Sequence, residues 1–79
     1  MKTKSIFTLN HWDYDQINEA CALLEDGYYV ELGASCIGHT LAAMVERQGI
    51  QKMRDIYGDR LEVVNIGGWD HCHLKEATV

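Results

Sequence analysis

Residues 13–32 read DYDQINEACALLEDGYYVEL, a segment that predicts one helix followed directly by one strand. Asp13, followed three residues later by Gln16, forms a capping-box pattern that predicts the start of a helix. Apolar side chains then recur at helical spacing, and Gly27 is typical of a residue that ends a helix. Residues 28–32 are rich in aromatic and β-branched side chains, so a strand is expected directly after the helix.

Before this segment, the side chains of residues 5–9 alternate between polar and apolar well enough to predict a short first strand. In the strand at 28–32, one side carries Tyr28, Val30 and Leu32 and the other carries Tyr29 and Glu31. After the turn at 33–35, Ser35 is the expected N-cap of a second helix. Its core-facing stripe is expected to comprise Ile37, Leu41, Met44, Val45 and Gln48. We expect Gly49 to interrupt this helix, with helical spacing resuming up to Gly58.

Two further strands are predicted near the end of the chain. Residues 61–66 alternate as a strand, Gly67-Gly68 suits a two-residue hairpin turn, and residues 69–74 return antiparallel. Residues 75–79 are expected to form a loose tail. The βαβαββ order predicts a single α+β domain over residues 1–79: a two-layer α/β sandwich whose small four-stranded sheet carries both helices on one face.

This element order is similar to that of the small sulfur-carrier proteins of the bacterial cytosol. The resemblance covers topology alone. Those proteins carry a Cys-Pro-x-Pro motif at the first helix, and this chain contains no proline. We therefore draw no function from the resemblance.

Composition narrows the class of protein. Of the 79 residues, 47% are hydrophobic, and this fraction is high enough to exclude intrinsic disorder. A chain of this length is too short to enclose a substrate cavity within its core. Cys21, Cys36 and Cys72 show no C-x-x-C spacing and are expected to be reduced. No signal peptide or membrane span is predicted, so we expect a cytoplasmic protein.

Charge is strongly asymmetric along the chain. Between Ser5 and Glu46 there are seven carboxylates and no lysine or arginine, whereas residues 47–79 hold five basic and five acidic residues. The net charge of −5 therefore belongs to the first half. An anionic face repels nucleic acid and membrane phosphates and attracts basic protein surfaces.

The predicted first helix concentrates this charge on one side. At about 100° per residue, Asp15, Glu19 and Asp26 fall within an arc of about 40°. Anions in the last turn of a helix oppose its dipole, and no basic residue on the helix offsets them. The expected partner-binding residues are Asp13, Asp15, Glu19, Glu25, Asp26, Glu31, Trp12 and Tyr29. A solvated helix face is the alternative, and the sequence does not decide between the two.

These features lead to a functional hypothesis. We expect a non-enzymatic interaction protein that docks on the basic surface of a larger nucleic-acid-binding protein, without a cofactor and without itself binding nucleic acid or membrane. The most specific form is a phage-type inhibitor, such as an anti-CRISPR, that competes with nucleic acid. A housekeeping subunit that binds a basic partner for assembly fits the same residues.

The runner-up hypothesis is a small thiol or metal-binding protein. Cys36 opens the predicted second helix with His39 three residues later, the layout of an activated thiol. The segment 69–74 adds His71, Cys72 and His73, so a Cys/His zinc site is the metal-binding form of this hypothesis, although no standard finger spacing occurs. The alternatives are a packed thiol at Cys36 and an exposed edge strand at 69–74 that its histidines keep soluble.

The remaining apolar positions are assigned to the core. They are Tyr14, Ile17, Cys21 and Leu24 in the first helix, Ile37, Leu41, Met44 and Val45 in the second, and Leu61 and Val63 in the third strand. Trp12 and Trp69 flank polar turns and are expected to be half exposed. A homodimer through Tyr28, Tyr29, Trp69 or an unpaired sheet edge stays open, although Asp70 and the histidines of 69–74 argue mildly against it.

Overall fold

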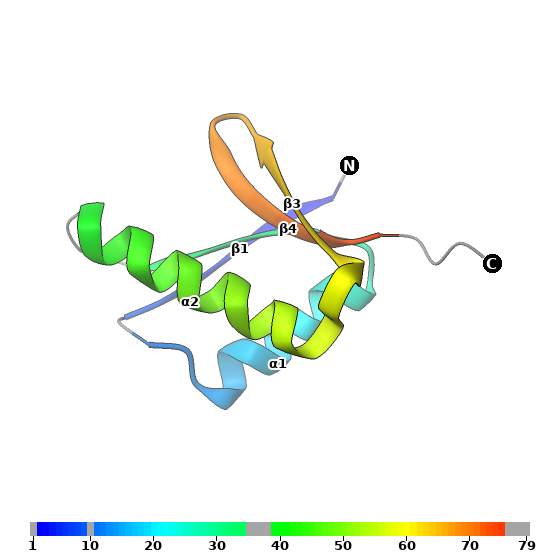
Figure 1. Ribbon diagram of the computed structural model, residues 1–79, viewed down its shortest axis with the longest axis horizontal. Coiled ribbons are helices and arrows are strands. Elements are labelled where there is room, and N and C mark those ends of the chain that lie inside the picture. Colours follow the sequence, from blue (N-terminus) through cyan, green and yellow to red (C-terminus); the bar gives the residue numbers. More distant parts are fainter. Residues whose placement is uncertain (1, 10, 35–38, 76–79) are drawn as a thin grey trace.

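The computed structural model describes residues 2–9, 11–34 and 39–75. Its elements follow the predicted βαβαββ order (Figure 1). They are β1 (Thr3–Thr8), α1 (Tyr14–Glu25), β2 (Tyr29–Ala34), α2 (His39–Tyr57), a 3-10 turn (Gly58–Arg60), β3 (Leu61–Ile66) and β4 (Trp69–Leu74). Ser35, Cys36, Ile37 and the predicted tail beyond Lys75 lie outside the described residues.

The four strands form one mixed sheet in the order β1-β2-β4-β3. β1 and β2 are parallel because α1 connects them, whereas β3 and β4 form an antiparallel hairpin that closes on Ile66 and Trp69. β4 pairs with β2 through Val30 and Cys72. Both helices pack on one face of this sheet, so the predicted two-layer α+β sandwich is confirmed (Figure 1).

The capping box predicted for α1 is present. The Gln16 backbone N–H donates to the Asp13 carboxylate at 3.0 Å, and the Asp13 N–H donates to the Gln16 side-chain oxygen at 3.2 Å. Past the end of the helix, Gly27 has a φ of 89°, a conformation that glycine adopts without steric cost. Local sequence therefore fixes both ends of α1.

The predicted interruption at Gly49 is wrong, since α2 runs without a break from His39 to Tyr57. The glycine serves packing instead. A Cβ at position 49 would lie 2.7 Å from Cε2 of Trp12, far inside normal contact distance. Gly49 therefore leaves room for an indole ring on the surface of the helix.

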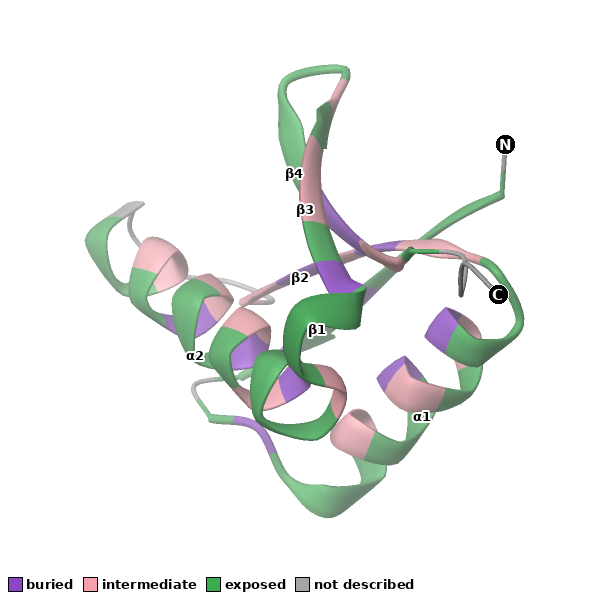
Figure 2. Ribbon diagram, turned by 45° about the vertical axis from the view of Figure 1, so that its right-hand side comes forward, coloured by how far each residue is buried: buried purple, intermediate pink, exposed green. Residues whose placement is uncertain are grey.

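The core lies between the helices and the sheet (Figure 2). Its most deeply buried side chains are Leu24, Val30, Val45, Met53 and Cys72. Leu24, Val45 and Leu61 confirm their predicted positions, but Tyr14, Leu41 and Met44 are 83%, 40% and 47% exposed and do not belong to the core. Tyr14 is the first residue of α1, and Leu41 and Met44 lie in the first turns of α2, which extend beyond the sheet (Figure 1).

The expected edge strand at 69–74 is also wrong. β4 lies inside the sheet, between β2 and β3, and β3 forms the edge. This placement accounts for the burial of Cys72, which is 1% exposed, because Val30 on one side and Val63 on the other pair with it. Within the described residues, neither helix is long and apolar enough to cross a membrane.

Candidate functional site

Three of the predicted partner-binding carboxylates lie along the outer surface of α1 and its C-cap. Asp15, Glu19 and Asp26 are all exposed, and the helical rise separates the first two by about 6 Å and the last two by about 10 Å. We call these three residues the acidic ridge. Lys2, which directly precedes β1, approaches one end, with its Nζ 4.0 Å from the Asp26 carboxylate. Elsewhere in the described chain, no lysine or arginine forms an ion pair with Asp15 or Glu19.

Asp13 and Glu25 have structural roles at the two ends of α1. Asp13 caps the helix, as described above, and Glu25 accepts a hydrogen bond from the Tyr57 hydroxyl at 3.2 Å. Burial, together with the contact with Cys21 and the Glu25 carboxylate, raises the pKa of Tyr57, so this hydroxyl stays a donor. The helix dipole disfavours the Glu25 carboxylate in the last turn of α1, but the Tyr57 hydroxyl from α2 stabilises it through this hydrogen bond.

Glu31 and Tyr29 do not join the acidic ridge. Val30 and Leu32 are buried beneath the helices, so the alternation of β2 directs Glu31 and Tyr29 to the opposite face of the sheet. There Ser5 Oγ donates to the Glu31 carboxylate at 2.7 Å, and the Tyr29 ring stacks on His73 with 4.3 Å between ring centroids. The eight expected partner-binding residues therefore do not all lie on one surface.

Trp12 is not a surface residue, which corrects a second expectation. Its side chain is 6% exposed, and its indole Nε1 donates to the backbone carbonyl of Val45 at 2.9 Å. Trp12 lies in the link between β1 and α1, where it fills the gap between that link and α2. Trp69, at 65% exposed, is the accessible tryptophan.

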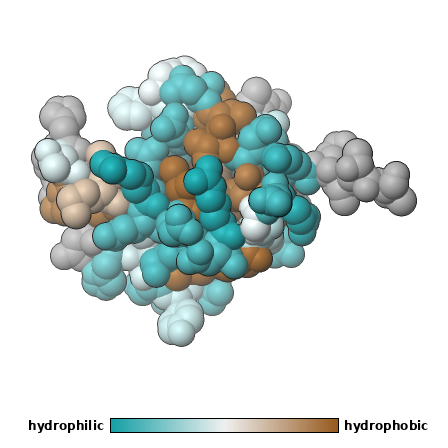
Figure 3. Space-filling view, viewed as in Figure 1, coloured by the Kyte–Doolittle hydropathy of each residue, from teal (hydrophilic) through white to brown (hydrophobic). Residues whose placement is uncertain are grey.

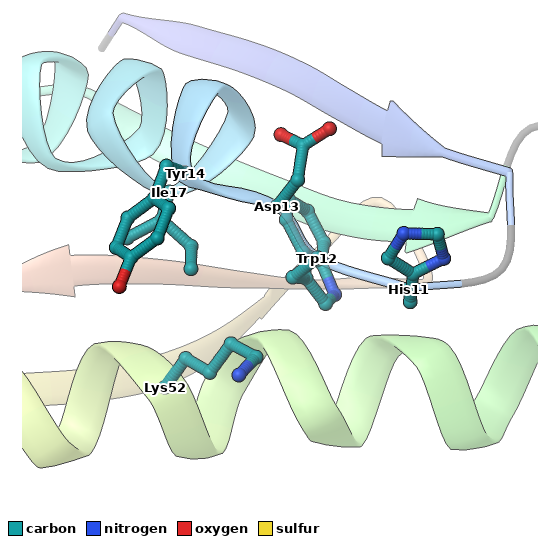
Figure 4. Close-up of a pocket in the computed structure, with 6 residues that line it drawn as sticks. All are labelled: His11, Trp12, Asp13, Tyr14, Ile17 and Lys52. Carbon is teal, nitrogen blue, oxygen red and sulfur yellow. The ribbon is translucent and has the colours of Figure 1, made fainter.

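Tyr14, rather than Trp12, is the exposed aromatic residue at the start of α1. It lines an open hollow of about 440 Å³ together with His11, Trp12, Asp13, Ile17 and Lys52 (Figure 4). Lys52 reaches into this hollow from α2, whereas the Asp13 carboxylate points away from α2 (Figure 4). The sequence did indicate that Tyr14 is the first residue of α1, since it directly follows the Asp13 capping box.

A second group of carboxylates lies apart from the ridge. Partial burial raises the pKa of Glu46 on α2, and the neighbouring carboxylates of Asp70 and Glu31 raise it further, while Arg47 opposes them. Hydrophilic side chains cover most of the face seen in Figure 3, with smaller apolar areas between them. Negative charge therefore extends beyond the acidic ridge, and in this second group Glu31 and Glu46 are partly buried whereas Asp70 is exposed.

The described residues of the proposed thiol or metal site lie on two opposite faces of the sheet. Cys72 lies on the helix-covered side, where burial raises the pKa of its thiol to about 12. His71 and His73 lie on the opposite side, and His73 Nε2 is 2.7 Å from the Glu62 carboxylate. Cys36 and the side chain of His39 are outside the described residues. In the described part of the chain, no three His, Cys, Asp or Glu side chains are placed to hold a metal ion.

Thiol labelling tests the state of Cys72. At neutral pH we expect a thiol reagent to modify Cys72 at least about tenfold more slowly than the partly buried Cys21, because only the thiolate reacts. Peptide mass spectrometry after timed labelling separates the two sites, and labelling in urea supplies the unfolded control. Equal native rates at the two cysteines would contradict the buried, protonated state.

Comparisons with protein-family models, with curated proteins and with solved structures find no match. The candidate site is therefore defined by the geometry of the described residues alone. It combines the acidic ridge with Tyr14, the aromatic residue next to Asp15.

Proposed function

We propose that this protein is a non-enzymatic interaction protein whose acidic ridge docks on a basic surface of a larger nucleic-acid-binding protein. The observation that carries the proposal is the row Asp15, Glu19 and Asp26 on one exposed helix face, with Lys2 as its single ion-pair partner among the described residues. Carboxylates about one and two helical turns apart offer a basic groove a row of negative charge comparable to a phosphate backbone.

Tyr14 supports docking in a way that charge alone does not. Exposed ion pairs contribute little net binding energy, and most interfaces depend on a few aromatic or arginine contacts. Tyr14 is 83% exposed and borders an open hollow, so its ring is available to a partner side chain. An arginine of the partner would find an aromatic face at Tyr14 and carboxylates along the ridge.

In its most specific form, the proposed protein is an inhibitor of the phage anti-CRISPR type that competes with nucleic acid. RNA-guided nucleases hold their nucleic acid in a positively charged channel, which is the kind of surface that the acidic ridge fits. The proposal places the protein in the cytoplasm, and the free thiols of Cys21 and Cys72 are compatible with that reducing compartment.

Charge reversal tests the ridge. Tagged protein is used to capture partners from a bacterial lysate with elution in a salt gradient, and the captured partner is then purified. We expect D15K/E19K to weaken binding to that partner at least about tenfold, about 1.4 kcal/mol, because it replaces attraction by repulsion. The matched control D55K/D59K makes the same change in net charge at two exposed positions outside the ridge.

The outcomes separate the alternatives. Equal weakening by the ridge and control variants would show attraction by net charge alone, and unchanged binding of D15K/E19K would exclude the ridge. Thermal melts of both variants establish that the fold is intact. Competition with nucleic acid for the purified partner distinguishes an inhibitor from an assembly subunit, since only the inhibitor must displace nucleic acid.

A further inference from the structure

The free edge of β3 lacks the devices that normally protect a sheet edge. β3 reads LEVVNI, with Glu62 as its one charged residue and no lysine or proline. In the described part of the chain no strand pairs with its outer side. The opposite edge, β1, carries the exposed Lys4. The hairpin of β3 and β4 also projects away from both helices, as Figures 1 and 2 show.

The alternation of hydrogen-bonded residues along the hairpin shows which backbone groups of β3 face the free edge. The Lys75 N–H donates to the Arg60 carbonyl at 2.8 Å, so alternate residues from Arg60 onward face β4. The residues between them, Leu61, Val63 and Asn65, direct their N–H and C=O groups to the free edge. The Leu61 N–H is already bonded to the Gly58 carbonyl in the 3-10 turn. Val63 and Asn65 therefore have both backbone groups available.

We propose that a second copy of this chain pairs with this edge, β3 against β3, in an antiparallel arrangement with its two-fold axis at Val64. Val63 of one copy then exchanges two N–H···O=C bonds with Asn65 of the second copy, and symmetry repeats the exchange, giving about four bonds. The product is a continuous eight-stranded sheet. The inference is independent of the proposed docking of the acidic ridge.

Charge disfavours the neighbouring register that has its two-fold axis at Val63. A two-fold axis at Val63 would set the two Glu62 residues about 7 Å apart along the strands. With the axis at Val64 the separation is about 13 Å, beyond the screening length of about 8 Å at physiological salt, and Glu62 lies opposite Ile66 of the second copy. The Val64 side chains then meet at the axis as an apolar pair.

Charge also favours a second copy as the occupant. Residues 47–79 hold equal numbers of basic and acidic residues, so pairing through β3 joins the nearly neutral halves of two molecules. Because β3 is the edge opposite β1, which lies beside α1, the two acidic ridges stay apart. Antiparallel self-pairing is also self-complementary, as a closed two-fold interface requires.

Amide hydrogen exchange in the unaltered protein tests the edge directly. Across protein concentrations from about 1 µM to 1 mM, we expect the amides of Val63 and Asn65 to gain protection as the dimer forms. The amides of Glu62 and Ile66 face β4 and are expected to change little. Sedimentation over the same range should show the mass rise from 9.0 kDa toward twice that value. A monomer throughout this range overturns the proposal, even if the Val63 amide is protected.

Charge swaps at the axis test the register and the identity of the occupant. Because two copies of residue 64 meet, V64E and V64K are each expected to be monomeric at concentrations where the unaltered protein is dimeric, and an equimolar mixture is expected to form a heterodimer. T3E and T3K, at an exposed position on β1, are matched controls expected to stay dimeric. Melting curves check the fold of each variant. If V64K alone stays dimeric, or the mixture stays monomeric, the Val64 register is overturned.

Discussion

Replacement of Trp12 by alanine is expected to destabilise the fold by about 3–5 kcal/mol, the range for truncating a buried aromatic side chain. A domain of 79 residues holds roughly 4–12 kcal/mol in total, so the variant should be close to unfolding. The loss has two parts, since the indole is 6% exposed and its Nε1 donates to the Val45 carbonyl at 2.9 Å. Urea and thermal unfolding measure the effect, and we expect the melting temperature to fall by more than about 12 °C.

Trp69 offers a matched control within the same chain. It is 65% exposed, so W69A should change stability by less than about 1 kcal/mol. The variant W12F separates the two contributions, because it keeps an aromatic ring and removes the donor to Val45. If W12A and W69A cost the same, Trp12 is not the packing residue described here.

Replacement of Gly49 by alanine is expected to destabilise the protein by about 1–3 kcal/mol, as overpacking does in a filled core. Helix propensity alone predicts the opposite sign, a gain of about 1 kcal/mol, for the same change inside a helix. The clash decides the sign because the new Cβ would lie 2.7 Å from Cε2 of Trp12. Chemical unfolding of G49A gives the free energy, and Q48A, at an exposed neighbouring position, is the control.

A double-mutant cycle isolates the contact between these two residues. In the W12F background the smaller ring leaves more room, so G49A should cost at least about 1 kcal/mol less than it does in the unaltered protein. Additive effects, or a stabilising G49A in the presence of Trp12, would contradict the close approach of the indole to α2.

The positions of the helices and strands were predictable because their signals are local. The capping box at Asp13 and Gln16, the stop at Gly27 and the hairpin turn at Gly67-Gly68 each depend on residues a few positions apart. Gly49 shows the limit of such reasoning. Its low helix propensity is real, but 37 residues separate it in the sequence from the ring that explains it.

The candidate site was predictable in part. Helical periodicity alone placed Asp15, Glu19 and Asp26 on one face, and all three are exposed. The residues expected around them are elsewhere, because Trp12 is buried against α2 and the pleat of β2 turns Glu31 to the other side of the sheet. Tyr14, assigned to the core by its spacing, is exposed at the start of α1.

By itself, the sequence determined the order of the elements, the ends of α1, the α+β class and the acidic ridge, since each depends on neighbours along the chain. Three features depend on tertiary contacts and could not be read from the sequence: β4 lies inside the sheet, β3 is its free edge, and an indole lies on Gly49. The reason is physical. Spacing along the chain sets which side chains share a face, but burial depends on which distant segment covers that face.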